Sequence, residues 1–246
     1  IISFVVKKFL YRLLRDKYVE NIFELYSAIR RSGVQNIFEN SLRAEFGEVI
    51  ERPLGSPRQF LHLDGLMFNP AQLHRFKTSE TVKVKTDVTI GPKAKKPLHL
   101  DIPLLISGIG YGIGFSKEAK LALAKASSRV GTATNSGEGP FLQEERDAAK
   151  YFIMQYHRGK WGKEEEVFKQ VDAVEIHMGK GAAAGVEVVI TPENLTPEAR
   201  QLMEIQEGDP AIIHARFPGM NNMTDFKCLV DELREVSGGV PIGVKM

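Results

Sequence analysis

Cysteine is scarce in this sequence: Cys228 is the only one among 246 residues. A single thiol cannot build a disulfide framework, nor can it supply the ligands of a cysteine-held iron–sulfur cluster within this chain. His62, His74 and His99 do not have the spacing of metal ligands. We therefore expect no disulfide framework, no metal and no iron–sulfur cluster in these residues, and we expect a cytoplasmic location.

Long apolar runs are lacking as well. The apolar start of the chain, residues 1–6, is far shorter than the ~20 residues that a membrane-spanning helix needs. A basic and aromatic run follows at residues 7–18, and its Leu and Phe stripe favours a solvated helix that packs on the protein body. The alternative is a peripheral anchor, through which residues 1–18 would contact a membrane surface.

Neither sign of charge is in excess. The chain has 33 Lys and Arg against 31 Asp and Glu, a net charge of +2, so no bulk attraction to nucleic acid is implied. We interpret the basic stretch at residues 91–97 as a solvated turn. Hydrophobic residues make up 43% and charged residues 26%, which is ordinary for a globular protein.

Three segments of different character follow one another. Residues 1–50 have a helical pattern and form an N-terminal extension, whereas 51–100 contain several prolines and an alternating run at 81–90, which predicts an arm with a strand or hairpin. From residue 101 strands and helices alternate, which is typical of a parallel sheet or an α/β barrel. We expect strands near 103–107, 131–135, 172–178 and 241–246, helices near 116–129, 142–156 and 224–236, and a looser insertion at 180–222.

The most informative stretch is residues 103–140. A short apolar run fits a buried strand, and Ser116 is placed to cap the helix that follows. Between them lies a strand-to-helix turn that would let a flat or anionic ligand touch the backbone. This turn differs from the G-x-G-x-x-G fingerprint, because Ile113 stands where the third glycine belongs, and this disfavours a nicotinamide Rossmann domain. The glycines of the turn are Gly108, Gly110, Gly112 and Gly114.

The run ISGIGYGIGFSKEAKLALAKASSRVGTATNSGEGP resembles the FMN-binding domain of glutamate synthases, and most closely the stand-alone FMN-binding glutamate synthase family. The likeness continues through residues 158–162, 174–182 and 241–246. It implies a (β/α)8 TIM-barrel flavoprotein, of which residues 101–246 hold about the first four βα units. Four units make half a barrel, so we expect the other half to come from another chain or from sequence that is not included here.

The resemblance implies an FMN site at the carboxyl ends of the strands. The turn at 107–110 would run its backbone beneath the isoalloxazine ring, and the charge of Lys245 would stabilise the reduced ring. Strand alternation places Glu175 and His177 on one face and Ile176 on the other. A plain tight turn and a simple Glu–His pair are the alternatives. The cofactor-binding residues implied are Ser107, Gly108, Ile109, Gly110, Asn135, Glu175, His177 and Lys245.

The same resemblance assigns catalytic roles to Glu138 and Lys245, and substrate contacts to Tyr111, Glu138 and Lys180. Residues 180–185 depart from the family, because they read K-G-A-A-A-G where glutamate synthases read Q-G-A-K-P-G. Lys180 thus replaces a Gln and Ala183 a Lys, both of which contact 2-oxoglutarate in the family. The flavin contacts survive better than the substrate contacts, so the identity of the oxoacid stays open.

The expected function is that of an FMN-dependent oxidoreductase of nitrogen assimilation. It would reduce the imino acid formed from 2-oxoglutarate and ammonia to glutamate. One alternative is a related FMN barrel acting on another amino or keto acid, as in N-methylglutamate formation. Another is a non-catalytic or partner-dependent barrel subunit. The expected partners are a ferredoxin or reductase subunit as electron donor, and a glutaminase or barrel-completing subunit.

Overall fold

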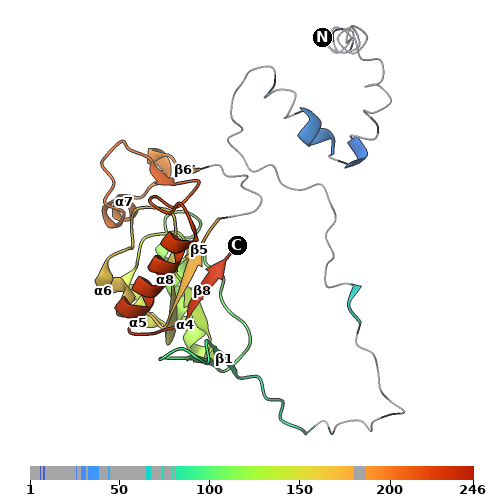
Figure 1. The fold of residues 1–246 in the computed structure, drawn as a ribbon, viewed down its shortest axis with the longest axis vertical. Coiled ribbons are helices and arrows are strands. Elements are labelled where there is room, and N and C mark those ends of the chain that lie inside the picture. Colours follow the sequence, from blue (N-terminus) through green and yellow to red (C-terminus); the bar gives the residue numbers. More distant parts are fainter. Residues whose placement is uncertain are drawn as a thin grey trace. The chain divides into compact units, whose positions relative to one another are not determined.

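The computed structural model describes residues 81–179 and 187–246 continuously, and before them only residues 6, 8, 26, 29–31, 33–38, 44, 65–67, 74 and 79. Residues 1–77 with 182–184 form one compact unit, and 78–181 with 185–246 form another. The second unit carries the elements described below (Figure 1). Most of the predicted extension and of the arm up to residue 80 lies outside the described residues.

A parallel sheet forms the centre of this unit, as predicted. Its strand order is β3-β4-β5-β8. The strands are β3 (Ala133–Asn135), β4 (Tyr151–Tyr156), β5 (Ala173–His177) and β8 (Ile242–Lys245). The predicted strand at 103–107 is not a regular strand, but the N–H of Ile106 donates to the carbonyl of Ala133 at 3.2 Å. This segment therefore runs along the edge of β3.

Helices cover one face of the sheet. They are α4 (Lys117–Val130), α5 (Gln143–Ala148), α6 (Glu165–Phe168) and α8 (Met223–Val236), and Figure 1 shows α5 and α8 on the same side of β5 and β8. The core between the layers contains Phe152, Met154, Val174, Ile176 and Leu233. Burial of these apolar side chains is the main force that holds the helices on the sheet.

The opposite face is closed at one end by a hairpin. Strands β1 (Val88–Ile90) and β2 (Leu98–Leu100) pair antiparallel, so only the last three residues of the alternating run 81–90 form a regular strand. Figure 1 shows β1 beside the end at which β8 begins. The buried cluster here contains Leu98, Leu100, Ala133, Ile153 and Ala173. These five residues are named the apolar end below.

The helix termini follow the sequence signals. The Ser116 side chain accepts a hydrogen bond from the N–H of Ala119, and α4 ends at Gly131 with φ 67°, a conformation that favours glycine. Asn222 and Asp225 form a reciprocal capping box at the start of α8. The helices predicted near 116–129 and 224–236 are therefore confirmed with shifts of one residue.

The helix predicted for residues 142–156 is wrong in its second half. Helix α5 ends at Ala148, and Tyr151–Tyr156 form β4, which lies between β3 and β5. The run Tyr-Phe-Ile-Met-Gln-Tyr is rich in aromatic and β-branched residues, which fit a pleated surface. As a consequence the sheet holds one strand more than predicted between residues 131 and 178.

The predicted insertion at 180–222 has structure of its own where it is described. It contains β6 (Val188–Ile190), a 3₁₀ turn (Pro192–Asn194), α7 (Pro197–Leu202) and β7 (Ala211–Ile213). Strands β6 and β7 pair antiparallel. Their core is shared with Trp161, which follows β4. The insertion is thereby attached near the carboxyl end of the sheet.

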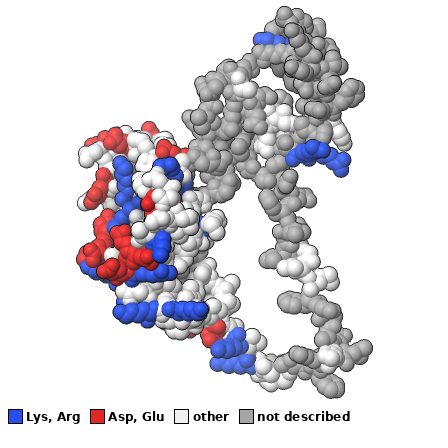
Figure 2. Space-filling model, in the orientation of Figure 1, with Lys and Arg blue, Asp and Glu red and all other residues white. Residues whose placement is uncertain are grey.

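Two surface properties bear on the expected partners. Within the described residues we find no helix that has the length and hydropathy to cross a membrane. On the face drawn in Figure 2, the described part carries both acidic and basic side chains.

Candidate functional site

Polar side chains gather at the carboxyl end of the inner sheet face. Glu175 of β5 accepts hydrogen bonds from the Asn135 amide at 3.0 Å and from the Gln155 amide at 2.6 Å. Asn135 also accepts from the N–H of Gly137 at 2.9 Å, which fixes its amide orientation. The three side chains from β3, β4 and β5 thus form one network at the position where α/β sheets hold ligands.

The alternation predicted for β5 is confirmed. Val174 and Ile176 pack into the core beneath the helices, whereas Glu175 and His177 face the polar network. His177 is 1% exposed, and in the parallel register it pairs with Lys245 of β8. Two ionisable side chains on this face require partners, because a buried charge without one is costly.

A second group adjoins this network and is centred on Glu138. Its Oε1 lies 2.9 Å from Nδ1 of His177 and 3.8 Å from the guanidinium of Arg158. All three residues are buried, and Arg158 also donates to the carbonyl of Ala215 at 2.9 Å. The carboxylate of Glu138 thus lies between an imidazole and a guanidinium. We name Asn135, Glu138, Gln155, Glu175 and His177 the polar end.

His157 is the next residue after β4 and is 1% exposed. Its Nδ1 lies 3.1 Å from the N–H of Gly159 and accepts a hydrogen bond from it, which leaves the proton of the neutral ring on Nε2. The ring packs on Trp161 with centroids 5.3 Å apart. Burial lowers the pKa of His157 from 6.5 to about 4, against the opposing field of Glu138. At neutral pH this imidazole is therefore uncharged.

The glycine-rich turn packs closely against other parts of this chain. A Cβ on Gly108 would lie 2.7 Å from the side-chain oxygen of Asn135, and one on Gly110 would lie 2.3 Å from the N–H nitrogen of Gly139. Glycine is therefore needed at 108 beside the Asn135 side chain, and at 110 because two backbone segments pack against each other. Ser107 and Ile109 remain exposed on the turn, so the turn is still open to a ligand on that side.

Tyr111, the predicted substrate residue, lies outside the polar end. Its hydroxyl donates to Glu198 of α7 at 2.9 Å and lies 3.2 Å from the Thr196 hydroxyl. Desolvation raises the pKa of Tyr111. The same Glu198 is 2.6 Å from Lys117, which is also 2.6 Å from Glu144. Tyr111 thus helps to fasten α7 to the start of α4.

Lys245 is half-buried near the end of β8, and its carbonyl accepts from the N–H of Met178 at 3.0 Å. Lys180, predicted to contact substrate, lies outside the described residues. Three site residues escaped the sequence analysis: Gln155, His157 and Arg158. The first two lie in or directly after β4, which was assigned to a helix, so their position at a strand end was hidden. The signal that could have found them is the aromatic run of β4, bounded by Gly159.

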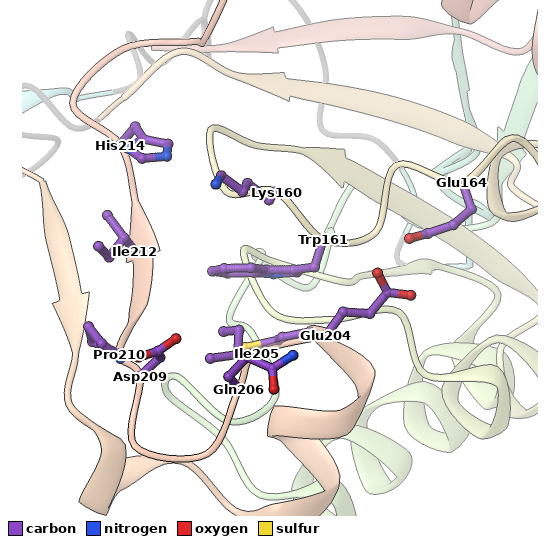
Figure 3. Close-up of a pocket in the computed structure, with 11 residues that line it drawn as sticks. Lys160, Trp161, Glu164, Glu204, Ile205, Gln206, Asp209, Pro210, Ile212 and His214 are labelled. Atoms are coloured by element: carbon purple, nitrogen blue, oxygen red, sulfur yellow. The ribbon is translucent and has the colours of Figure 1, made fainter.

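A cavity of about 340 Å³ lies behind this site (Figure 3). Trp161 lies in the middle of its lining, with Lys160 and His214 on one side and Ile205 on the other. The indole N–H of Trp161 donates to the carbonyl of Glu138 at 2.9 Å. The wall of the cavity is thereby connected to the backbone of the polar end. Among the described residues, no group of three His, Cys, Asp or Glu side chains is arranged to hold a metal ion.

The arrangement defines a class: an α/β protein with a buried polar site at the carboxyl ends of parallel strands. Comparison with known proteins gives the family. Residues 62–246 match the model described as a conserved region in glutamate synthase, and the chain belongs to the glutamate synthase family. This confirms the resemblance carried by the glycine-rich turn.

Curated relatives agree. The chain is 30% identical over 198 residues to a glutamate synthase large subunit-like protein of Rhizobium meliloti, with 79% of this chain and 45% of the relative covered. It is 31% identical over 167 residues to an archaeal-type glutamate synthase [NADPH] of Thermotoga maritima (68% and 32%). For the archaeal glutamate synthase [NADPH] of Methanocaldococcus jannaschii the identity is 32% over 155 residues (63% and 29%). The chain thus spans less than half the length of these relatives.

Among solved structures, one described as a lactate oxidase of Pediococcus acidilactici aligns with this chain. The alignment covers 67% of this chain and 45% of the lactate oxidase chain. The TM-score is 0.38 and the sequence identity 15%. A likeness at this level carries no argument, and the fold is described from the elements of this chain alone.

Proposed function

We propose that this chain provides part of an FMN-binding glutamate synthase-like barrel, which reduces the imino acid formed from 2-oxoglutarate and ammonia to glutamate. The observation that carries the proposal is the polar end: five side chains from β3, β4, β5 and the loop after β3, brought together in a chain of the glutamate synthase family. The relatives named above bear the name glutamate synthase.

The residues present fit a flavin. Oε1 of Gln155 and Nε2 of His177 are buried and have no hydrogen-bond partner in the described structure. Such atoms are costly unless a ligand satisfies them, and a flavin ring edge offers alternating donors and acceptors. Glu175 would accept from the ring N–H, Asn135 would bind its edge, and Lys245 would supply a cation. Ser107 and Ile109 would line one side.

When bound, FMN supplies hydride transfer, which no amino-acid side chain can perform. The chain's own contribution is orientation and proton handling. Glu138 would orient the nitrogen of the amine adduct. Loss of water from that adduct requires a proton at its hydroxyl, and the imidazole of His177, 2.9 Å from Glu138, would be placed to supply it. Burial of both groups keeps bulk water out of this proton transfer.

The barrel itself is part of the proposal. Within the described residues, the sheet runs from the segment beside β3 to β8, which pairs with β5 on one side. Strand β8 is partly exposed, with Val244 at 45%. An open parallel edge of this kind presents unpaired N–H and C=O groups, which a further strand would satisfy. We assign residues 101–246 to the first half of the barrel, with a partner or further sequence completing it.

The test is an FMN titration of the purified chain followed by absorbance, and then turnover with 2-oxoglutarate, ammonia and a chemical reductant. We expect one flavin bound per chain and formation of glutamate. Glu138→Gln should retain flavin binding and lose turnover. If neither the chain alone nor the chain with its barrel-completing partner takes up FMN, the proposal is wrong.

A second candidate function is the same reaction with another amine in place of ammonia. Arg158 and His177 lie against Glu138, and the sequence replaces the family's Gln and Lys with Lys180 and Ala183. The replaced residues contact 2-oxoglutarate in the family, so this difference concerns substrate rather than flavin. Turnover with methylamine in place of ammonia, with N-methylglutamate as product, would favour this candidate. Preference for ammonia would favour glutamate.

A further inference from the structure

Helix α4 buries a lysine. The side chain of Lys120 is 1% exposed, and its Nζ lies 2.9 Å from Oε1 of Glu145 on α5, itself 2% exposed. Burial lowers the pKa of Lys120 and raises the pKa of Glu145. Replacement of such a pair by apolar residues of similar volume is often neutral or stabilising. A contribution to stability therefore does not explain why this pair is present.

The contacts of the pair point to the end of β3. Nζ of Lys120 donates to the carbonyl of Asn135 at 2.7 Å and to that of Ser136 at 3.4 Å. Thr134 of the same strand donates to Glu145 at 3.3 Å. The last residues of β3 are thus held from the helix side of the sheet.

The segment that is held carries two of the five residues of the polar end, Asn135 and Glu138. The Asn135 side chain binds Glu175 on the inner face, and Glu138 follows three residues later, against His177. The carbonyl of Glu138 accepts from the indole N–H of Trp161 at 2.9 Å. The position of this loop therefore depends on contacts made at both of its ends.

We propose that Lys120 is a positioning residue: its ammonium, which Glu145 balances in charge, donates to the strand-end carbonyls of Asn135 and Ser136 and so places Asn135 and Glu138 in the site. Without it the loop loses a charge-assisted donor to two carbonyls and becomes free to shift. Displacements of this size at a site lower binding and turnover even when the fold persists. The inference rests on the proposed function only for its effect on flavin binding.

The chain contains a built-in reporter, because Trp161 is its only tryptophan and its indole N–H is bonded to Glu138. The test variant is Lys120→Met/Glu145→Leu, which removes both charges at similar volume. We expect an unchanged midpoint of urea unfolding, with exchange of the indole N–H about tenfold faster. Acrylamide quenching of Trp161 should also rise, and FMN affinity should fall about tenfold, the equivalent of one lost hydrogen bond.

Two controls separate positioning from stability. Ser127→Ala alters a fully buried hydroxyl on the same helix that bonds within α4 and should leave Trp161 unchanged. Glu145→Gln keeps Lys120 and its carbonyl contacts, so it should lower stability but leave indole exchange near the wild-type rate.

The proposal is overturned if the folded double variant shows wild-type indole exchange and quenching. It is also overturned if the double variant does not fold, or if Glu145→Gln accelerates exchange as much as the double variant does. The indole measurements need no flavin. A wild-type chain that binds no FMN would therefore remove the proposed function and leave the test of Lys120 intact.

Discussion

The inner face of the parallel sheet has two ends with opposite chemistry. At the apolar end, Leu98 and Leu100 of the hairpin pack on Ala133, Ile153 and Ala173. At the polar end, two residues further along the same strands, amides, carboxylates and an imidazole contact one another. A step of two residues keeps a side chain on the same face, so one strand supplies both ends, as Ile153 and Gln155 do in β4.

The difference separates stability from function. Apolar burial contributes to folding in proportion to the area removed from water, whereas buried polar groups contribute little net stability and are costly when unpartnered. Changes at the apolar end should therefore unfold the chain, and changes at the polar end should impair binding while the fold persists. The predictions below test this separation in order of decreasing effect.

The largest effect is expected for Leu100→Ala. Leu100 is 2% exposed at the apolar end, and truncation of such a leucine costs about 2–5 kcal/mol of unfolding free energy. Urea denaturation measures it, with Leu104→Ala as the control, because Leu104 is 68% exposed. The chain that remains folded should bind FMN as the wild type does. A cost for Leu100→Ala no larger than that of the control would contradict the separation.

The next effect depends on pH and concerns His157. Its pKa is about 4 in the folded chain and 6.5 in the reference state, so it stays neutral in the fold while the unfolded chain takes up a proton. Its contribution is fully present above pH 6.5 and is lost as the pH falls towards 4. The loss amounts to about 3 kcal/mol in total, from a pKa difference between 6.5 and about 4.

Urea denaturation between pH 7 and pH 5 measures this contribution. His157→Gln removes the titrating group, so the variant should lose less stability over that range than the wild type. The carboxylates titrate in both proteins and cancel in the comparison. Parallel pH profiles for the two proteins would show that His157 is not held neutral by the fold.

At the polar end, Lys245→Met should weaken FMN binding about tenfold, since one charge-assisted interaction is lost. Unfolding free energy should change by less than about 0.5 kcal/mol, because the side chain is half-buried and methionine retains most of its apolar stem. Flavin titration and urea denaturation on the same preparation give both values. A large loss of unfolding free energy with normal FMN affinity would show that Lys245 contributes to stability and not to flavin binding.

The same separation explains what the sequence could predict. Period-two alternation in residues 174–177 and the Ser116 cap are local signals, and each predicted its element correctly. The reason for the glycines at 108 and 110 could not be predicted, because the clash partners, Asn135 and Gly139, are about 30 residues away in sequence. Tertiary packing decides such positions.

Asn135 and His177, which the family resemblance implied as flavin contacts, do lie together at strand ends, and their role in binding stays a prediction. Gln155 and His157 were missed because β4 follows α5 after only two residues, and its apolar run is compatible with either helix or strand by periodicity. The placement of Tyr111 against Glu198 likewise depends on a contact 87 residues away. The contact of Tyr111 leaves no local signal in the sequence, whereas the aromatic run of β4 is the local signal that could have revealed Gln155 and His157.

The smallest effect is expected where charges are paired at the surface. Lys117 contacts Glu144 and Glu198 at 2.6 Å, closer than the buried pair of Lys120 and Glu145 at 2.9 Å. Solvent screens the exposed pairs, so Lys117→Ala should leave the urea midpoint and the exchange of the Trp161 indole N–H unchanged. The buried pair should behave oppositely, since Lys120→Met/Glu145→Leu alters indole exchange. If substitution of Lys117 and substitution of the Lys120–Glu145 pair changed indole exchange equally, the buried position of the second pair would not explain its effect.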